Sequence, residues 1–171
     1  MPIHVFVDET KARGLLMAAA RCPSGDVTVT RKALKGLLLP GQERLHFNHE
    51  RPARRKQILE VITGFHLLVD LYRADRDTHA DRRQCLEAIV RDCASSAERL
   101  VVELEESTYE HDRRWLRDAT RRFGCHETLR WDVLVAKADP LLWVPDAVAW
   151  SWMRGGEWRR AVAPFCQLRG L

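Results

Sequence analysis

The stretch that decides the fold is IHVFVDET, residues 3–10. Its first part, Ile3–Val7, is apolar and β-branched apart from one histidine, which predicts a buried strand that ends at Asp8 and Glu9. Because side chains alternate along a strand, these two carboxylates are expected to point to opposite faces of a sheet. Asp8 is therefore a candidate metal ligand at a strand end; the alternative is an acid that merely begins a turn.

Short elements are expected to follow this strand. The apolar segments Leu15–Arg21 and Val27–Thr30 predict two strands, separated by the turn residues Pro23-Ser24-Gly25. Residues 31–38 predict a short helix, which Pro40 and Gly41 would stop, and residues 45–47 predict a weak third strand. The early part of the chain is thus expected to be rich in strands.

Beyond residue 50, helices and strands are expected to alternate. Apolar residues at helical spacing predict four helices, with Thr78 as the N-cap of the second and glycines after the last two. Such an order predicts an α/β fold: one domain over residues 1–171, with a mixed sheet of about five to six strands and helices packed on it. The predicted helices cover residues 52–63, 79–97, 109–123 and 145–153, and the predicted strands cover residues 65–72, 100–104 and 129–136.

Composition and cysteine usage indicate where the protein acts. The 171 residues are 46% hydrophobic, which suits one globular core, and the longest apolar run, Leu15–Ala20, is far shorter than the roughly 20 residues that span a bilayer. The five cysteines are an odd number without CxxC spacing, a pattern typical of reduced structural cysteines. No targeting segment is recognisable at the start. We therefore expect a cytoplasmic protein that has no contact with a membrane.

The basic residues favour a nucleic-acid partner. The net charge is +4, and 23 of the 28 basic residues are arginine, the side chain that binds phosphates in a bidentate manner. A GC-rich genome would produce the same bias. Arg113, Arg117 and Arg121 share one face of a predicted helix and are candidate substrate-binding residues, although interleaved acids make a solvated face an alternative. The six tryptophans could stack on bases, fill the core or form the interface of a homo-oligomer.

The acidic residues at element ends form the candidate catalytic set. Carboxylates from different elements can together hold divalent cations that promote hydrolysis, and Mg²⁺ or Mn²⁺ suits oxygen ligands. Asp146 lies in the first turn of an otherwise apolar helix, where a carboxylate needs a partner. Glu103 and Glu105 share a face of a predicted strand, and Glu105 is preferred because it is nearer the strand end. The principal predicted ligands are Asp8, Glu105 and Asp146.

Other residues are weaker candidates. Asp112 begins a helix and is expected to assist in catalysis; the alternative is an acid stabilised by the helix dipole. Glu9 and Asp70 are possible additional acids, each on a predicted strand, as is Glu103. His46 and His49 could bind a metal or transfer protons, although HxxH in a loop more often marks structural or exposed histidines.

Together these motifs resemble the ribonuclease H-like superfamily, in particular an uncharacterised branch whose first strand ends in Asp-Glu-Ser. Here threonine replaces the serine, at Thr10. The pair His46-Phe47, the acidic strand end at residues 101–106 and the segment 145–149 are similar to motifs of that branch, and the resemblance spans roughly residues 3–152. It implies a metal-dependent nuclease, that is, a hydrolase acting on RNA or DNA. The alternatives are an inactive domain that binds nucleic acid or a protein, and a nuclease that depends on a partner.

Overall fold

The sheet at the centre of the molecule is mixed, as predicted. The computed structural model describes residues 1–171 and contains six strands in the order β5-β4-β1-β2-β3-β6. Strand β2 is antiparallel to both of its neighbours, and the other adjacent pairs are parallel, so β2 alone runs against the rest. The strands are β1 Ile3–Thr10, β2 Leu15–Pro23, β3 Leu68–Ala74, β4 Ala97–Glu103, β5 Arg130–Leu134 and β6 Cys166–Arg169.

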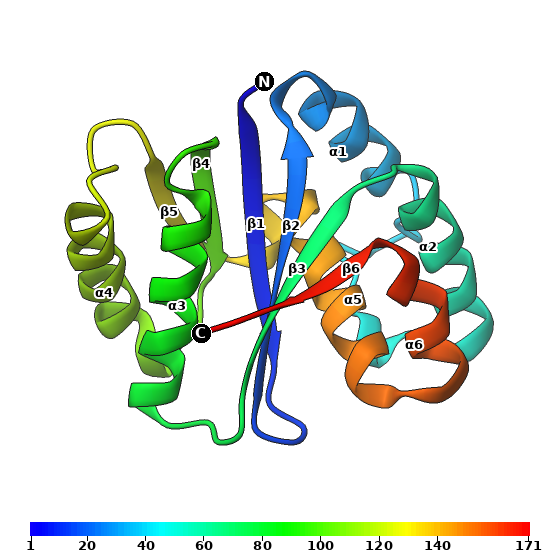
Figure 1. Ribbon diagram of the computed structural model, residues 1–171. Helices are drawn as coiled ribbons and strands as arrows, with labels where there is room; N and C mark the ends of the chain where they lie inside the picture. The colour runs from blue at the N-terminus through cyan, green and yellow to red at the C-terminus, as the bar shows by residue number, and fades with distance from the viewer.

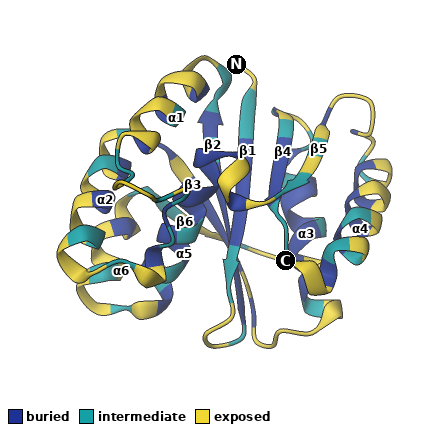
Figure 2. Cartoon of the chain, turned by 180° about the vertical axis from the view of Figure 1, so that it is seen from behind, coloured by how far each residue is buried: buried dark blue, intermediate teal, exposed yellow.

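Helices cover both faces of this sheet (Figure 1). Two of them, α3 and α4, pack on one face, and the other four lie on the opposite face. Each face has its own cluster of buried apolar side chains, and Figure 2 shows the central strands buried between the two helical layers. The helices are α1 Val27–Lys35, α2 Pro52–Gly64, α3 His79–Cys93, α4 Tyr109–Arg122, α5 Trp143–Arg154 and α6 Gly156–Val162.

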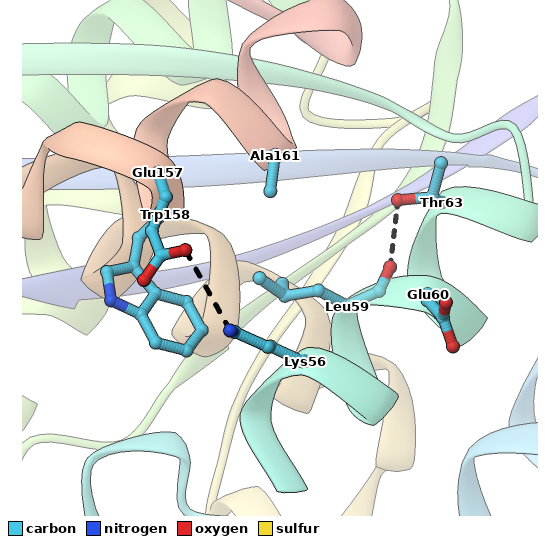
Figure 3. A pocket seen from close by; sticks show the side chains of 7 residues that line it. All are labelled: Lys56, Leu59, Glu60, Thr63, Glu157, Trp158 and Ala161. Carbon is cyan, nitrogen blue, oxygen red and sulfur yellow. Dashed lines mark hydrogen bonds and ion pairs between the residues drawn. The ribbon is translucent and has the colours of Figure 1, made fainter. Parts of the chain in front are cut away.

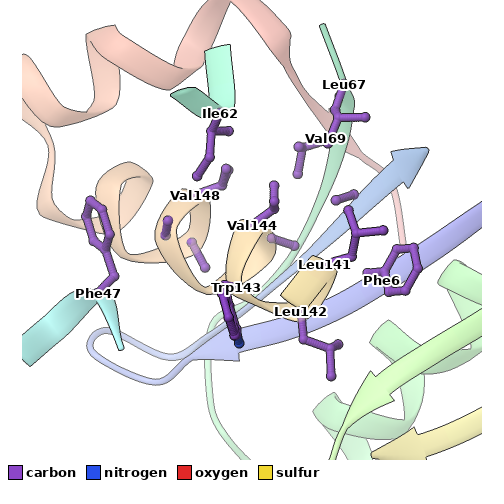
Figure 4. Close-up of a cluster of buried hydrophobic side chains, with 14 of the residues drawn as sticks. Phe6, Phe47, Ile62, Leu67, Val69, Leu141, Leu142, Trp143, Val144 and Val148 are labelled. Atoms are coloured by element: carbon purple, nitrogen blue, oxygen red, sulfur yellow. The ribbon is translucent and has the colours of Figure 1, made fainter. Parts of the chain in front are cut away.

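Helix α5 is the apolar centre of its layer (Figure 4). Its buried residues Val144 and Val148 point into a cluster that includes Phe6 of β1 and Ile62 of α2. The helix packs directly on β1 and β2. Close packing against both strands therefore fixes the position of this helix relative to the end of β1.

Local signals for helix ends are confirmed. The Thr78 side chain accepts a hydrogen bond from the Asp81 amide, and the Asp81 carboxylate accepts one from the Thr78 amide, which makes a capping box at the start of α3. Gly124 follows α4 with a φ of 67°, and Gly155 follows α5 with a φ of 76°. Both conformations are left-handed and favour glycine, so these two residues end their helices.

Several predicted elements were wrong. Val27–Thr30 is not a strand but the start of α1, because Val27, Thr30 and Leu34 bury one helical face. Residues 45–47 form no strand; they lead into a short 3-10 turn at Phe47–His49. Helix α5 begins two residues before Pro145. Strand β3 begins at residue 68, because His66 has a φ of 56° in the turn before it.

Residues near the C-terminus form α6 and the edge strand β6. None of the helices combines the length and the apolar character needed to cross a bilayer. All five cysteines are free, and four of them are buried.

Candidate active site

Three carboxylates from three elements lie at one end of the sheet. Asp8 is near the end of β1, and Glu103 ends the neighbouring strand β4. The two strands are parallel, and Val7 pairs with Val102, so the next residues of each strand lie side by side. Asp146 reaches the same place from the first turn of α5. All three line a cleft of about 550 Å³ on the face of the sheet that α5 covers.

Burial and mutual repulsion dominate the electrostatics of these acids. Asp8 is only 8% exposed, and its pKa is raised well above the usual value by burial, by a hydrogen bond with Glu103, and by the charges of Glu103 and Asp146. Burial also raises the pKa of Asp146 to about 6, against the opposing effect of the Phe47 amide, which donates a hydrogen bond of 3.0 Å to its carboxylate. Negative charge is thus concentrated here at a cost in stability.

Arg44 is the cation closest to this acidic cluster. Its Nη1 lies 3.3 Å from Glu103 Oε1, and its Nη2 lies 4.0 Å from Asp146 Oδ2. One guanidinium therefore pairs with two of the three carboxylates. The excess of oxygen ligands with negative charge is the chemistry that suits a hard divalent cation. As the side chains stand, no three His, Cys, Asp or Glu residues are placed to hold one ion, so binding requires some of them to reorient.

His46 lines the same cleft. Its Nδ1 is buried and has no hydrogen-bond partner, and its ring packs edge-on against His49 at 3.9 Å between centroids. Burial, with smaller effects of Arg44 and His49, lowers the pKa of His46 below its usual value of 6.5. The imidazole is therefore neutral at neutral pH and can accept a proton or bind a metal.

The raised pKa of Asp146 predicts a pH dependence of stability in the metal-free protein. A carboxyl with a folded pKa of about 6, against 3.8 as the usual value, stabilises the fold below pH 4, and this contribution is lost as the pH rises through 6. The free energy of unfolding of Asp146→Asn minus that of wild type is therefore expected to increase between pH 4 and pH 7, by about 2 kcal/mol. Urea unfolding in EDTA at several pH values measures this, and a difference that stays constant with pH would contradict it.

The structure favours Glu103 over Glu105, the reverse of the order inferred from the sequence. Strand β4 ends at Glu103, one residue earlier than predicted, so Glu103 is the residue beside Asp8. Glu105 lines the rim of the same cleft, where its carboxylate accepts a hydrogen bond of 3.2 Å from Ser107. Both glutamates thus face the cleft, but only Glu103 contacts Asp8.

The carboxylates of Glu9 and Asp112 meet at Arg82 on the opposite face of the sheet, although Glu9 is also among the residues that line the acidic cleft. The buried guanidinium of Arg82 binds the Asp112 carboxylate in a bidentate manner, with distances of 2.7 and 2.8 Å, and donates to both oxygens of Glu9. Thr108 completes the surroundings of Asp112 at 3.2 Å. The role inferred for Asp112 from the sequence required it to lie near Asp8. The structure instead holds Asp112 at Arg82, away from Asp8. Its carboxylate is held by Arg82 because α4 packs on α3.

Asp70 and the arginines of α4 are also separate from the acidic cluster. Asp70 pairs with Arg21 at 3.1 Å, and the two line another cleft beside β6. Arg113, Arg117 and Arg121 lie on α4, which covers the face of the sheet opposite to α5. A role for these arginines at the acidic cleft would need a substrate that reaches around the sheet.

A solved structure resembles this chain in its fold. It is described as the structure of the PCNA:RNase HII complex from Archaeoglobus fulgidus; the match has a TM-score of 0.60 and 16% sequence identity, and covers 95% of this chain and 76% of that chain. The chain has a ribonuclease H-like fold. No protein-family model and no curated protein matches the sequence significantly.

Within this ribonuclease H-like fold, several residues of the cleft were missed in the sequence. Arg44 and Asn48 line it from the loop between α1 and α2, and Trp150 lines it from α5. Nothing distinguishes Arg44 among 23 arginines before the loop is placed in space. Trp150 could have been inferred from the sequence, because it follows Asp146 by one helical turn and therefore lies on the same face of the helix.

Another cleft, of about 400 Å³, lies between α2 and α6 and shares no residue with the acidic one (Figure 3). Leu59, Trp158 and Ala161 line it, and its cation, Lys56, lies 3.8 Å from the Glu157 carboxylate. Of these two clefts, only the one at Asp8 therefore contains a concentrated group of carboxylates.

Proposed function

We propose that this chain is a divalent-metal-dependent nuclease that hydrolyses phosphodiester bonds of RNA or DNA. The observation that carries the proposal is the meeting of Asp8, Glu103 and Asp146 in one cleft, with an excess of negative charge that a cation would relieve. The ribonuclease H-like fold of the chain supports the same reaction class. A single domain over residues 1–171, acting in the cytoplasm, is part of this proposal.

The residues that would hold Mg²⁺ or Mn²⁺ are Asp8, Glu103 and Asp146, with Glu105 at the rim as a further oxygen donor. When bound, the metal supplies positive charge to the phosphate and lowers the pKa of the attacking water. Neutralising the carboxylates would also remove the penalty that burial imposes on Asp8 and Asp146.

The other residues of the cleft have separate roles in this proposal. The Phe47 amide fixes one oxygen of Asp146 and so orients the carboxylate. Arg44, which pairs with Glu103 and Asp146, is the guanidinium available to bind a non-bridging phosphate oxygen once a metal neutralises those acids. The imidazole of His46, whose pKa is lowered by burial, lines the cleft and is the proton acceptor in this proposal.

A matched pair of glutamate variants tests the site together with the function. Wild-type protein is expected to cleave labelled RNA or DNA with Mn²⁺ and not with EDTA. Glu103→Gln is expected to lose most of this activity, because the side chain contacts Asp8, whereas Glu105→Gln at the rim is expected to lose several-fold less. Gel-based cleavage rates at fixed Mn²⁺ measure both. Cleavage that continues in EDTA, or greater loss in Glu105→Gln, would contradict the proposed ligand set.

A catalytically inactive domain that binds nucleic acid or a protein is the second candidate. The observation that favours it is the double ion pair of Arg44 with Glu103 and Asp146, which partly neutralises the acids from within the chain. In that case the protein would bind oligonucleotides in a salt-dependent manner, and Mn²⁺ titrated calorimetrically would give no binding heat. Metal binding that Asp8→Asn removes would reject this alternative.

A further inference from the structure

A second cleft adjoins the acidic one and continues it. It has a volume of about 340 Å³ and shares Thr10, Ala12 and Trp150 with the acidic cleft. Its other residues are Arg13, in the turn between β1 and β2, and Met153 and Arg154 of α5. The two clefts therefore adjoin at Trp150, with the carboxylates of the acidic cleft on one side and Arg13 and Arg154 on the other.

The two arginines of the second cleft are free to bind a ligand. Arg13 and Arg154 are exposed, and neither takes part in an ion pair or a hydrogen bond within the chain. By contrast, the neighbouring Arg55 is engaged, because its guanidinium donates to the backbone carbonyls of Phe47 and Asn48. Two unpaired guanidinium groups in one cleft match the charge and the geometry of a phosphate.

Trp150 forms a fixed wall at the junction of the two clefts. Its indole Nε1 donates to Asn48 Oδ1 at 3.2 Å, and its ring packs edge-on against Phe47 and Trp158 at 5.3 and 5.5 Å between centroids. The Arg55 guanidinium lies over the same ring at 4.2 Å from its centroid, and the Arg154 guanidinium lies at 5.8 Å. An aromatic side chain held in place beside a free guanidinium is a combination found in sequence-independent nucleic-acid sites.

We propose that the second cleft is a phosphate subsite for the nucleic-acid strand that the acidic cleft acts on. The strand passes from the carboxylates over Trp150 and places a neighbouring phosphodiester between Arg13 and Arg154. This inference rests on the proposed nuclease function for the identity of the ligand. The two clefts adjoin at Trp150, so the proposed occupant is a single strand with at least one phosphate beyond the one at Asp8.

Binding measured without cleavage tests the subsite. Fluorescence anisotropy in EDTA follows a labelled single-stranded octanucleotide on wild type, Arg13→Gln, Arg154→Gln and the control Arg160→Gln. Arg160 is exposed on α6 and lines neither cleft. The first two variants are expected to weaken binding about threefold to tenfold and to lower the slope of log K against log salt by about one. Arg160→Gln is expected to bind like wild type.

A length comparison makes the test sharper. A labelled dinucleotide has one phosphodiester, which without metal is repelled by the carboxylates at Asp8 and can bind only at Arg13 and Arg154. It is expected to bind wild type more weakly than the octanucleotide does, and Arg154→Gln is expected to weaken its binding as well. If the octanucleotide binds all four proteins equally, or if Arg160→Gln weakens it as much as Arg154→Gln does, the subsite is wrong. These outcomes are independent of cleavage: a protein that never cleaves can still lose binding in Arg154→Gln, and an active nuclease can show no such loss.

Discussion

Replacing Asp8 by asparagine is expected to abolish metal-dependent cleavage and, in the same protein, to raise the stability of the metal-free fold. Activity is lost because the amide cannot supply the charged oxygen that β1 contributes to the cleft. The loss is expected to exceed the tenfold to hundredfold that substitutions of outer partners of a metal typically cause. Stability rises because the change removes a buried carboxyl whose pKa is raised by burial and by Glu103 and Asp146.

Two measurements on one preparation check this expectation. Cleavage rates with Mn²⁺ and melting temperatures in EDTA are compared for wild type, Asp8→Asn and the control Asp118→Asn, which makes the same chemical change at an exposed position of α4. The control is expected to match wild type in both. A melting temperature that falls in Asp8→Asn would show that its carboxylate stabilises the fold, and retained activity would remove Asp8 from the catalytic site.

Replacing Arg82 by methionine is expected to destabilise the protein more than any change at the cleft. Arg82 is 1% exposed, and its loss leaves the fully buried Asp112 and the nearly buried Glu9 without their cation. Breaking a buried ion pair by removing one partner typically costs 3–5 kcal/mol, since an uncompensated charge stays in the interior. For a chain of this length such a cost corresponds to a fall in melting temperature of roughly 10 °C.

The adjacent residue provides the control for this change. Arg83 is 52% exposed at its side chain and pairs with Glu87 within the same helix, so Arg83→Met is expected to alter the free energy of unfolding by less than about 0.5 kcal/mol. Adding Asp112→Asn to Arg82→Met is expected to restore part of the stability, because one of the two uncompensated charges is removed. Equal stabilities of the two methionine variants would show that Arg82 is not a buried cation in solution.

The parts of this structure that the sequence predicted are those encoded locally. Strand β1 and the opposite directions of Asp8 and Glu9 follow from alternation in a continuous apolar stretch. The capping box at Thr78 and the glycine after α4 are also short-range signals. Asp8 and Asp146 were singled out because each is an acid among apolar residues. A carboxylate in such surroundings is costly to bury unless it has a partner.

The parts that were missed depend on contacts between distant segments. Asp112 had the sequence position of a helix-start acid, but its partner Arg82 lies 30 residues earlier, and only the packing of α3 on α4 brings them together. Arg44 reaches Glu103 across 59 residues from a loop with no regular pattern. The order of Glu103 and Glu105 depended on where β4 ends, and strand ends are set by pairing with neighbours.

The small side chains of β2 have a consequence for which ions the cleft could accept. Ala18 and Ala20 are fully buried on the face that α5 covers, and α5 meets them with small residues of its own, including Ala147. The separation of helix and sheet, and with it the gap between Asp8 and Asp146, is therefore set by methyl groups on a strand that supplies no ligand. Larger side chains at these alanines would move the helix away from the sheet. The ion size that the cleft prefers could therefore be changed from the middle of the sheet, while every coordinating residue stayed the same.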